Sequence, residues 1–206
     1  PENPMTEPQM RRAPTQKRSR ERVDAILANA TDMIAQTGSD ALRMSELAQR
    51  TGISIGSLYQ YFPDKSAVVH ALAERCNEES RACIAEGLAA VGSMDALAEA
   101  FGGLIDTYYA IFLAEPVIRD IWSAVQADGA LRAMEAEESR RNGALLAARL
   151  RILRPKADPD RIEAVALLVM HLGEATMRLA VSVDRAEGDR LVEAYKRMAI
   201  RELTAL

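Results

Sequence analysis

This sequence is poor in cysteine, histidine and aromatic residues. Its 206 residues contain two cysteines, two histidines and nine aromatic side chains. Cys76 and Cys83 lie seven residues apart on what reads as one helix, which separates their Cα atoms by roughly 10 Å, too far for a disulfide. We therefore expect two small buried thiols in a protein of a reducing cytoplasm.

The motifs of the common enzyme chemistries are also lacking. The two histidines lie far apart in the sequence, and we find no metal-ligand spacing, no glycine-rich phosphate loop and no nucleophile elbow. An enzyme built on a helical bundle would need convergent catalytic groups. We therefore expect no enzymatic activity, no cofactor and no bound metal.

Long apolar segments are lacking as well. The longest strongly apolar run, residues 164–173, is too short to span a bilayer, and no signal peptide opens the chain. These absences predict a cytoplasmic protein with no membrane partner.

What the sequence does contain favours helices almost everywhere. Apolar residues make up 49% of the chain, which is ample for a buried core, and alanine, leucine, arginine and glutamate dominate. The β-branched residues are scattered, and glycine and proline are widely spaced. The predicted fold class is all-α, with about nine helices.

The net charge of −4 conceals an asymmetry along the chain. Residues 9–23 carry six basic side chains against one acidic, whereas residues 66–206 carry 17 basic and 22 acidic ones. A basic N-terminal segment on an acidic body suggests that only one end meets a polyanion. A solvated leader explains the same charges, and we expect residues 1–17 to be a disordered basic arm.

Residues 18–66 are predicted to form a helix-turn-helix domain. A first helix ends before Gly38, which suits a left-handed position, and two short helices follow at 44–50 and 55–61. The spacing of Ala48, Gly52 and Leu58 is typical of a helix-turn-helix. Ala48 would be the small residue where the two helices touch, Gly52 would take the tight turn between them, and Leu58 would close the core from the next helix.

The short third helix and the residue after it carry three aromatic side chains, Tyr59, Tyr61 and Phe62. Leu58 and Phe62 are four residues apart and predict its buried side, which leaves Tyr59 and Tyr61 available to DNA. Ser54 can cap the helix and leave its first N–H groups facing phosphate. A plain aromatic core cluster is the alternative, which we disfavour because three rings on so short a helix cannot all turn inward.

Residues 26–72 resemble the DNA-binding domain of the tetracycline-repressor (TetR) family of bacterial transcription regulators. The segment GISIGSLYQYFPDK, 52–65, fills every fixed position of the pattern G-[VI]-S-x-G-[TS]-L-Y-x-[YH]-F-x-x-K. The resemblance implies contacts to phosphates or base edges from Ser57, Tyr59, Tyr61 and Lys65. It also implies base contacts from Ser45 and Gln60, because some family members read bases with the residues at these two positions.

Two positions depart from the family. Ile55 stands where lysine or glutamine is common and can pack on a thymine methyl, while Arg43 replaces the usual Ser or Thr cap of the second helix. From the residues and the resemblance together, the predicted DNA-binding set is Arg43, Ser45, Ser54, Ile55, Gly56, Ser57, Tyr59, Gln60, Tyr61 and Lys65.

The rest of the chain, 67–206, is predicted to be a helical ligand-binding and dimerisation domain. A long helix from Lys65 to about residue 90 would link it to the DNA-binding domain. Large apolar and aromatic side chains gather in its middle, as in an apolar pocket, although a filled core explains each one singly. The candidate ligand-binding residues are Phe101, Tyr108, Tyr109, Phe112, Trp122, Met134, Met170, His171, Glu174 and Met177.

The last two predicted helices suggest a dimer. Asp158-Pro159 is a clear helix start, and two amphipathic helices per subunit can form a four-helix bundle with a twin subunit. A hairpin buried on its own domain is the alternative, but a single helix-turn-helix reads too few base pairs to be selective. The candidate dimer residues are Ile162, Ala166, Val169, Gly173, Ala180, Leu191, Tyr195 and Met198.

These predictions point to a homodimeric, ligand-responsive transcriptional regulator. Its expected partners are a palindromic DNA operator and a small apolar or amphipathic effector that releases it. The alternative is a constitutive DNA-binding protein whose helical body serves only dimerisation and whose core is filled.

Overall fold

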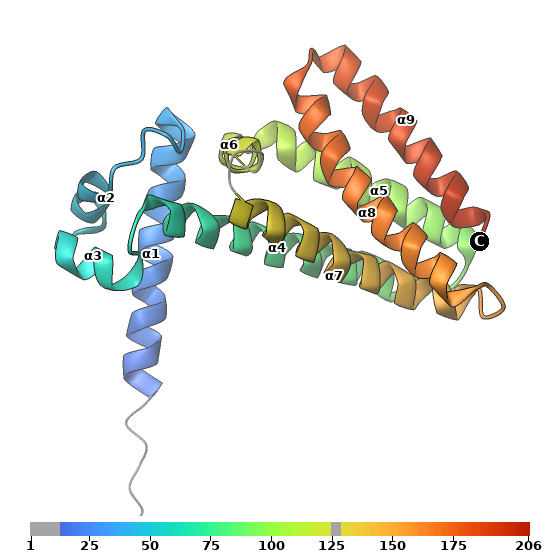
Figure 1. The fold of residues 1–206 in the computed structure, drawn as a ribbon, viewed down its shortest axis with the longest axis horizontal. Helices are drawn as coiled ribbons and strands as arrows, with labels where there is room; N and C mark the ends of the chain where they lie inside the picture. Colours follow the sequence, from blue (N-terminus) through green and yellow to red (C-terminus); the bar gives the residue numbers. More distant parts are fainter. Residues whose placement is uncertain (1–12, 125–128) are drawn as a thin grey trace, which may run out of the picture. The chain divides into compact units, whose positions relative to one another are not determined.

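The computed structural model describes residues 13–124 and 129–206, except the side chains of 13–16 and 122–124. Within these ranges it contains nine α-helices and no strand (Figure 1). The all-α prediction is therefore confirmed. In chain order the helices are α1 (Ala13–Thr37), α2 (Met44–Thr51), α3 (Ile55–Tyr61), α4 (Lys65–Ala89), α5 (Met94–Ala114), α6 (Pro116–Ala124), α7 (Gly129–Leu153), α8 (Pro159–Ser182) and α9 (Arg185–Thr204).

The chain divides into two compact units, Pro1–Val68 and Val69–Leu206. The division falls within the first turn of α4, two residues after the boundary expected from the sequence. The first unit therefore contains α1, α2, α3 and the start of α4, and all later helices belong to the second.

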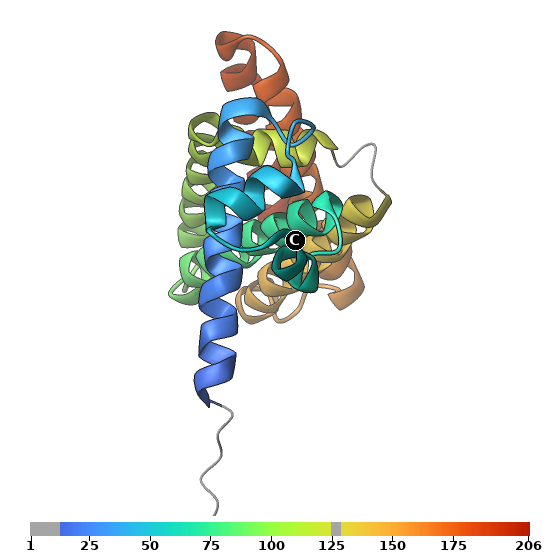
Figure 2. The ribbon, with the colours of Figure 1, turned by 90° about the vertical axis from the view of Figure 1, so that its left-hand side faces the viewer.

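In the first unit, α2 packs against α1 and α3 packs against α2 (Figures 1 and 2). Apolar residues at helical spacing on α1 form one side of the core, and Leu47, Leu58 and Phe62 close it from α2 and α3. The buried residues of α1 are Ile26, Leu27, Ala30, Met33 and Ile34.

Two glycines turn the chain between these helices. Gly38 has φ 82° and Gly52 has φ 70°, both in the left-handed region that side chains with a Cβ disfavour. Past Gly52, the Ile53 N–H donates to the Ala48 carbonyl at 3.0 Å, which ends α2 and starts the turn. Both glycine predictions are confirmed.

The N-terminal boundary of α1 differs from the prediction. α1 begins at Ala13, so residues 13–17, which we expected to be disordered, are helical. Pro14 is compatible with a first helical turn, where its missing N–H would have no helical partner. Lys17 and Glu21 then face each other one turn apart. Residues 1–12 of the predicted arm lie outside the described residues.

In the second unit, α8 is the central helix. It packs between α7 and α9, and α5 contacts both α8 and α9 (Figure 1). α7 also runs beside α4: Arg149 donates to the Ala89 carbonyl at 2.5 Å and to the Val91 carbonyl at 3.2 Å, where α4 ends. This guanidinium satisfies carbonyls that the helix itself leaves unpaired.

Two helices, α5 and α8, are long and apolar enough to cross a membrane by length and composition alone. Both take part in the core of the second unit, with Leu97, Phe101 and Ile105 buried on α5 and Ile162 and Met177 buried on α8. Their apolar character is thus that of core helices.

Candidate DNA-binding surface and effector cavity

The start of α3 is built by the sequence that precedes it. The Ser54 side chain accepts a hydrogen bond from the Ser57 N–H at 3.1 Å and caps the helix, as expected. Arg43 occupies the equivalent position before α2 but makes no capping bond with its side chain. It is exposed, as are Ser45, Gly56 and Gln60.

The apolar and aromatic residues of α3, together with Phe62, which ends it, divide between the core and the surface. Leu58 is fully buried and Phe62 nearly so, whereas Tyr59 is 50% exposed and Ile55 41% exposed. Tyr61 and Ser57 are half-buried. The helix therefore presents Ile55, Tyr59 and Gln60 outward on a segment that has no charged side chain of its own.

Lys65 has a structural partner. Its Nζ donates to the Asp40 carbonyl at 3.0 Å, which joins the first turn of α4 to the turn between α1 and α2. The lysine remains exposed. Its bond to Asp40 therefore helps to position this turn.

The second unit contains a cavity of about 180 Å³. Its walls are mainly apolar and come from α4, α5, α6, α7, α8 and α9. The described residues that line it are Cys76, Asn77, Glu79, Ser80, Cys83, Ile84, Phe101, Leu104, Ile105, Thr107, Tyr108, Ile111, Ile118, Asn142, Met170, Gly173, Glu174, Met177 and Tyr195.

The structure brings five of the ten candidate ligand-binding residues to this cavity: Phe101, Tyr108, Met170, Glu174 and Met177. Phe112 is buried behind it and meets the Tyr108 ring edge-on, with centroids 5.0 Å apart. The side chain of Trp122 lies outside the described residues.

Three further candidates lie elsewhere, because periodicity gives a helix face but not the neighbour that it meets. Tyr109 faces α9, where Arg185 stacks over its ring at 5.5 Å. Met134 is half-buried away from the cavity. His171 is exposed and lies in an outer groove between α7 and α8.

Two asparagines that sequence reasoning missed also line the cavity. Asn77 on α4 and Asn142 on α7 are 5% and 3% exposed, and Asn142 Oδ1 has no hydrogen-bond partner. Both stand on helices with many polar residues, so nothing in the one-dimensional pattern marks them. Cys76 and Cys83 line the cavity too. Cys76 is half-buried, and burial raises the pKa of its thiol, but Cys83 is exposed, so the prediction of two buried cysteines is wrong.

Glu174 is the buried acid of the cavity wall. Desolvation, followed by the nearby charge of Glu135, raises the pKa of Glu174 from 4.5 to about 8, although Arg178 opposes the shift. Its carboxylate oxygen lies 3.4 Å from the Ser139 hydroxyl. At neutral pH the group is therefore largely protonated.

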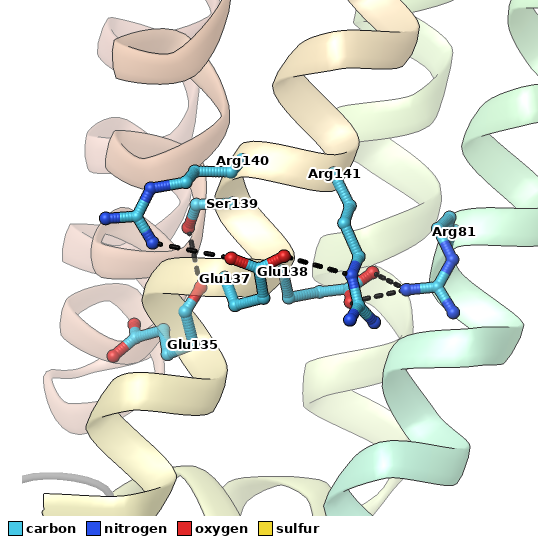
Figure 3. Close-up of polar contacts among 7 residues, drawn as sticks. All are labelled: Arg81, Glu135, Glu137, Glu138, Ser139, Arg140 and Arg141. Atoms are coloured by element: carbon cyan, nitrogen blue, oxygen red, sulfur yellow. Dashed lines mark hydrogen bonds and ion pairs between the residues drawn. The ribbon is translucent and has the colours of Figure 1, made fainter.

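Two further buried glutamates, Glu138 and Glu135, lie on α7 and have arginine partners. Arg81 of α4 donates to both carboxylate oxygens of Glu138, at 2.6 and 2.5 Å (Figure 3). Arg178 of α8 pairs with Glu135. These pairs satisfy the buried charges and tie α4 and α8 to α7.

Glu135, His171 and Glu174 place three possible ligand atoms within 4.8 Å of one another. The sequence spacing gave no sign of this group, because Glu135 comes from a different helix. Since Glu135 is held by Arg178 and the His171 Nδ1 lies 3.1 Å from the Ser139 hydroxyl, hydrogen bonds and ion pairs already account for the arrangement.

Most of the predicted dimer residues are turned into their own subunit. Ile162, Ala166, Val169, Ala180 and Tyr195 are buried, Gly173 and Leu191 are partly covered, and only Met198 is strongly exposed. The stripe of small residues thus serves packing within the subunit. The opposite face of α8 presents exposed leucines: Leu167, Leu168, Leu172 and Leu179.

Comparison with known proteins gives the family. The profile of the bacterial regulatory proteins of the tetR family matches residues 26–72, and that of the tetracyclin repressor-like C-terminal domain matches residues 95–206. None of the curated proteins matches the sequence.

Solved structures share the fold at low identity. A TetR-family transcriptional regulator from Streptomyces coelicolor is 24% identical with a TM-score of 0.69, over 91% of this chain and 98% of that one. RolR in complex with resorcinol is 20% identical with a TM-score of 0.63, over 92% and 95%. The repressor AlkX from Dietzia is 17% identical with a TM-score of 0.59, over 89% and 96%.

The C-terminal profile alone spans more than half of the chain, and it begins beyond the helix-turn-helix that the first profile covers. Both domains of a regulator are therefore present in the expected order. The chain belongs to the TetR family of transcriptional regulators, which are soluble DNA-binding proteins.

Proposed function

We propose that this protein is a cytoplasmic transcriptional repressor that leaves its operator when a small molecule enters the cavity of the second unit. The observation that carries the proposal is the pairing of an exposed α3 in a helix-turn-helix with a largely apolar cavity in the other unit.

In this proposal, α3 reads the base sequence of the operator. Tyr59 and Gln60 supply hydrogen-bonding groups, and Ile55 supplies an apolar contact that suits a thymine methyl in the major groove. Ser57, Tyr61, Arg43 and the exposed basic residues of α1 meet phosphates, which fix the register but carry no base information. Those basic residues are Lys17, Arg18, Arg20 and Arg22.

The protein acts as a homodimer that joins through the exposed leucine face of α8 and Met198 of α9. Leu168 is 56% exposed in the isolated subunit, and a row of such leucines on one helix face is an apolar patch that a soluble protein covers. A four-helix bundle with the twin subunit buries it. This assignment replaces the small-residue stripe expected from the sequence.

The effector acts by preferring the conformation that does not bind DNA. α4 begins in the first unit and lines the cavity in the second with Cys76, Asn77 and Ser80, so a ligand contacts the helix that continues into the DNA-binding unit. A tenfold preference for one conformation corresponds to about 1.4 kcal/mol of coupling. RolR, which shares this fold, is solved with the small aromatic compound resorcinol.

A gel-shift assay on fragments of the intergenic region upstream of the gene tests DNA binding. Wild type should shift one fragment, and Tyr59→Ala should abolish the shift while the dimer persists in size-exclusion chromatography. The exposed Ile152→Ala serves as the matched control and should bind as wild type does. Binding by Tyr59→Ala with wild-type affinity would refute the assignment of α3.

The alternative, a constitutive DNA-binding protein, requires a filled core in the second unit. The cavity argues against it. If no compound from a panel of small apolar and amphipathic molecules raises the melting temperature, the constitutive function is favoured instead.

A further inference from the structure

The charge of the cavity lining has one sign. Among the residues that the structure describes, the acidic side chains on the wall are Glu79 and Glu174, and the lining includes no lysine, arginine or histidine. Glu79 is largely exposed and has Arg75 as a partner at 3.6 Å. Glu174 is the acid that the cavity itself encloses.

Among the described residues, Glu174 differs from the nearby buried glutamates because it forms no ion pair with an arginine. Glu138 has Arg81 and Glu135 has Arg178, so each of these carboxylates has its own guanidinium. Glu174 has the Ser139 hydroxyl at 3.4 Å. Burial keeps Glu174 protonated in the absence of a partner, and a cation in the cavity would give its ionised form the kind of partner that Glu135 and Glu138 already have.

The rest of the wall adds shape and apolar surface. Asn142 is 3% exposed, and its Oδ1 is so enclosed by protein atoms that a ligand in the cavity does not reach it. The remaining wall offers apolar and aromatic surface from Phe101, Ile105 and Tyr108, and aromatic faces attract cations.

We propose that the effector is a small lipophilic amine that binds as its ammonium cation, with the charged nitrogen against the Glu174 carboxylate and the apolar body against the aromatic and aliphatic side chains. This inference rests on the proposed function, because it takes the cavity as the effector site. A cavity of about 180 Å³ holds one aromatic ring with a short chain, since a 150 Å³ cavity accommodates benzene.

Binding of such a cation releases a proton from Glu174. Without a ligand the carboxyl group faces Glu135, Glu138 and Ser139 of α7 and His171 and Arg178 of α8. Tyr108 and Tyr195 are its neutral neighbours, and its pKa is about 8. An alkylammonium ion keeps its charge over the same range. The amine therefore binds more tightly as the pH rises from 6 to 8, because fewer protons must leave the site.

Isothermal titration calorimetry with phenethylamine and phenethyl alcohol tests the inference, because the two probes differ only in the charged group. Wild type should bind the amine at least about tenfold more tightly than the alcohol at pH 8. Glu174→Gln should remove this preference and keep the affinity for the alcohol. Glu79→Gln removes the same unit of charge at the exposed edge and should keep the preference.

Two results would overturn the amine assignment: equal or tighter binding of the alcohol by wild type, or an unchanged preference in Glu174→Gln. Melting curves without ligand establish that both variants are folded. The proposed function is judged separately, by whether either probe releases the operator fragment in the gel shift. Release of the operator fragment by phenethyl alcohol alone would support the proposed function but refute the amine assignment.

Discussion

The hydroxyl of Tyr195 donates to the backbone carbonyl of Val169 at 2.5 Å, which fixes α9 against α8 inside one subunit. Burial raises the pKa of this phenol, as expected for a group that stays protonated. The bond lies next to Gly173, where an added Cβ would stand 3.0 Å from the Tyr195 oxygen. Two residues predicted to join subunits thus join helices of the same chain.

Tyr195→Phe should therefore lower the stability of the subunit and leave its assembly unchanged. The loss of one buried hydrogen bond costs about 1 kcal/mol. Urea unfolding measures the change, and sedimentation velocity measures the oligomer. Dissociation of the oligomer at unchanged stability would show that Tyr195 belongs to the subunit interface after all.

Gly143→Ala should destabilise the packing of α7 on α8. An added Cβ at this position would lie 3.0 Å from the Cα of Leu167 and 3.1 Å from its N, and backbone atoms cannot turn aside as a flexible side chain can. Overpacking of this kind costs about 1 to 3 kcal/mol.

The matched control is Gly103→Ala on α5, where nothing lies within 4 Å of the added Cβ. This substitution should stabilise the protein by up to about 1 kcal/mol, because alanine favours a helix more than glycine does. Thermal melting of both variants decides the matter. Equal shifts for the two would contradict the close crossing of α7 and α8.

The stability of the wild type should fall as the pH rises toward 8. The pKa of Glu174 is raised from 4.5 to about 8 in the folded state, so the folded protein holds a proton that the unfolded chain loses. That stabilisation is complete below about pH 4.5, shrinks as the pH approaches 8 and is absent well above it, an effect on the order of a few kcal/mol.

Glu174→Gln cannot ionise and should lack this component. The difference in unfolding free energy between the variant and wild type should grow in favour of the variant from pH 5 to pH 9. Urea titrations at several pH values measure it. Parallel curves for the two proteins would mean that the carboxyl group is ionised in the folded state.

Leu168→Asp should convert the dimer to monomers without unfolding the subunit. The side chain is exposed in the isolated chain, so a carboxylate costs little there, whereas burial against the twin subunit would leave the charge unpaired. Multi-angle light scattering gives the mass. Ile152→Asp, at an exposed position on α7, is the control and should remain dimeric.

The sequence predicted the local structure well, because the signals involved are local. Gly38 and Gly52 are glycines at positive φ, Ser54 and Asp158 cap helices, and the bounds of α3 agree with the expectation. Each of these depends on residues within one helical turn. The resemblance to a family with a well-defined motif fixed the place of α3 in the fold.

The cavity and the proposed dimer surface were harder to predict, because they depend on which helices meet. Small residues such as Ala166 and Gly173 mark a close crossing, but the pattern does not say whether the partner helix comes from the same chain. Asn77 and Asn142 carry no signal of their own until α4 and α7 are brought to one wall. His171 and Glu174 share a helix, yet one is exposed and the other buried.

The absence of charge from α3 has a consequence for how selectivity responds to ionic strength. In the proposed function, basic side chains on α1 and before α2 supply the attraction to phosphate, and added salt weakens that attraction for every DNA sequence alike. The groups of α3 that we propose to meet bases are uncharged. Raising the salt concentration should therefore shorten the time spent on all sites in similar proportion and leave the ranking of operators intact.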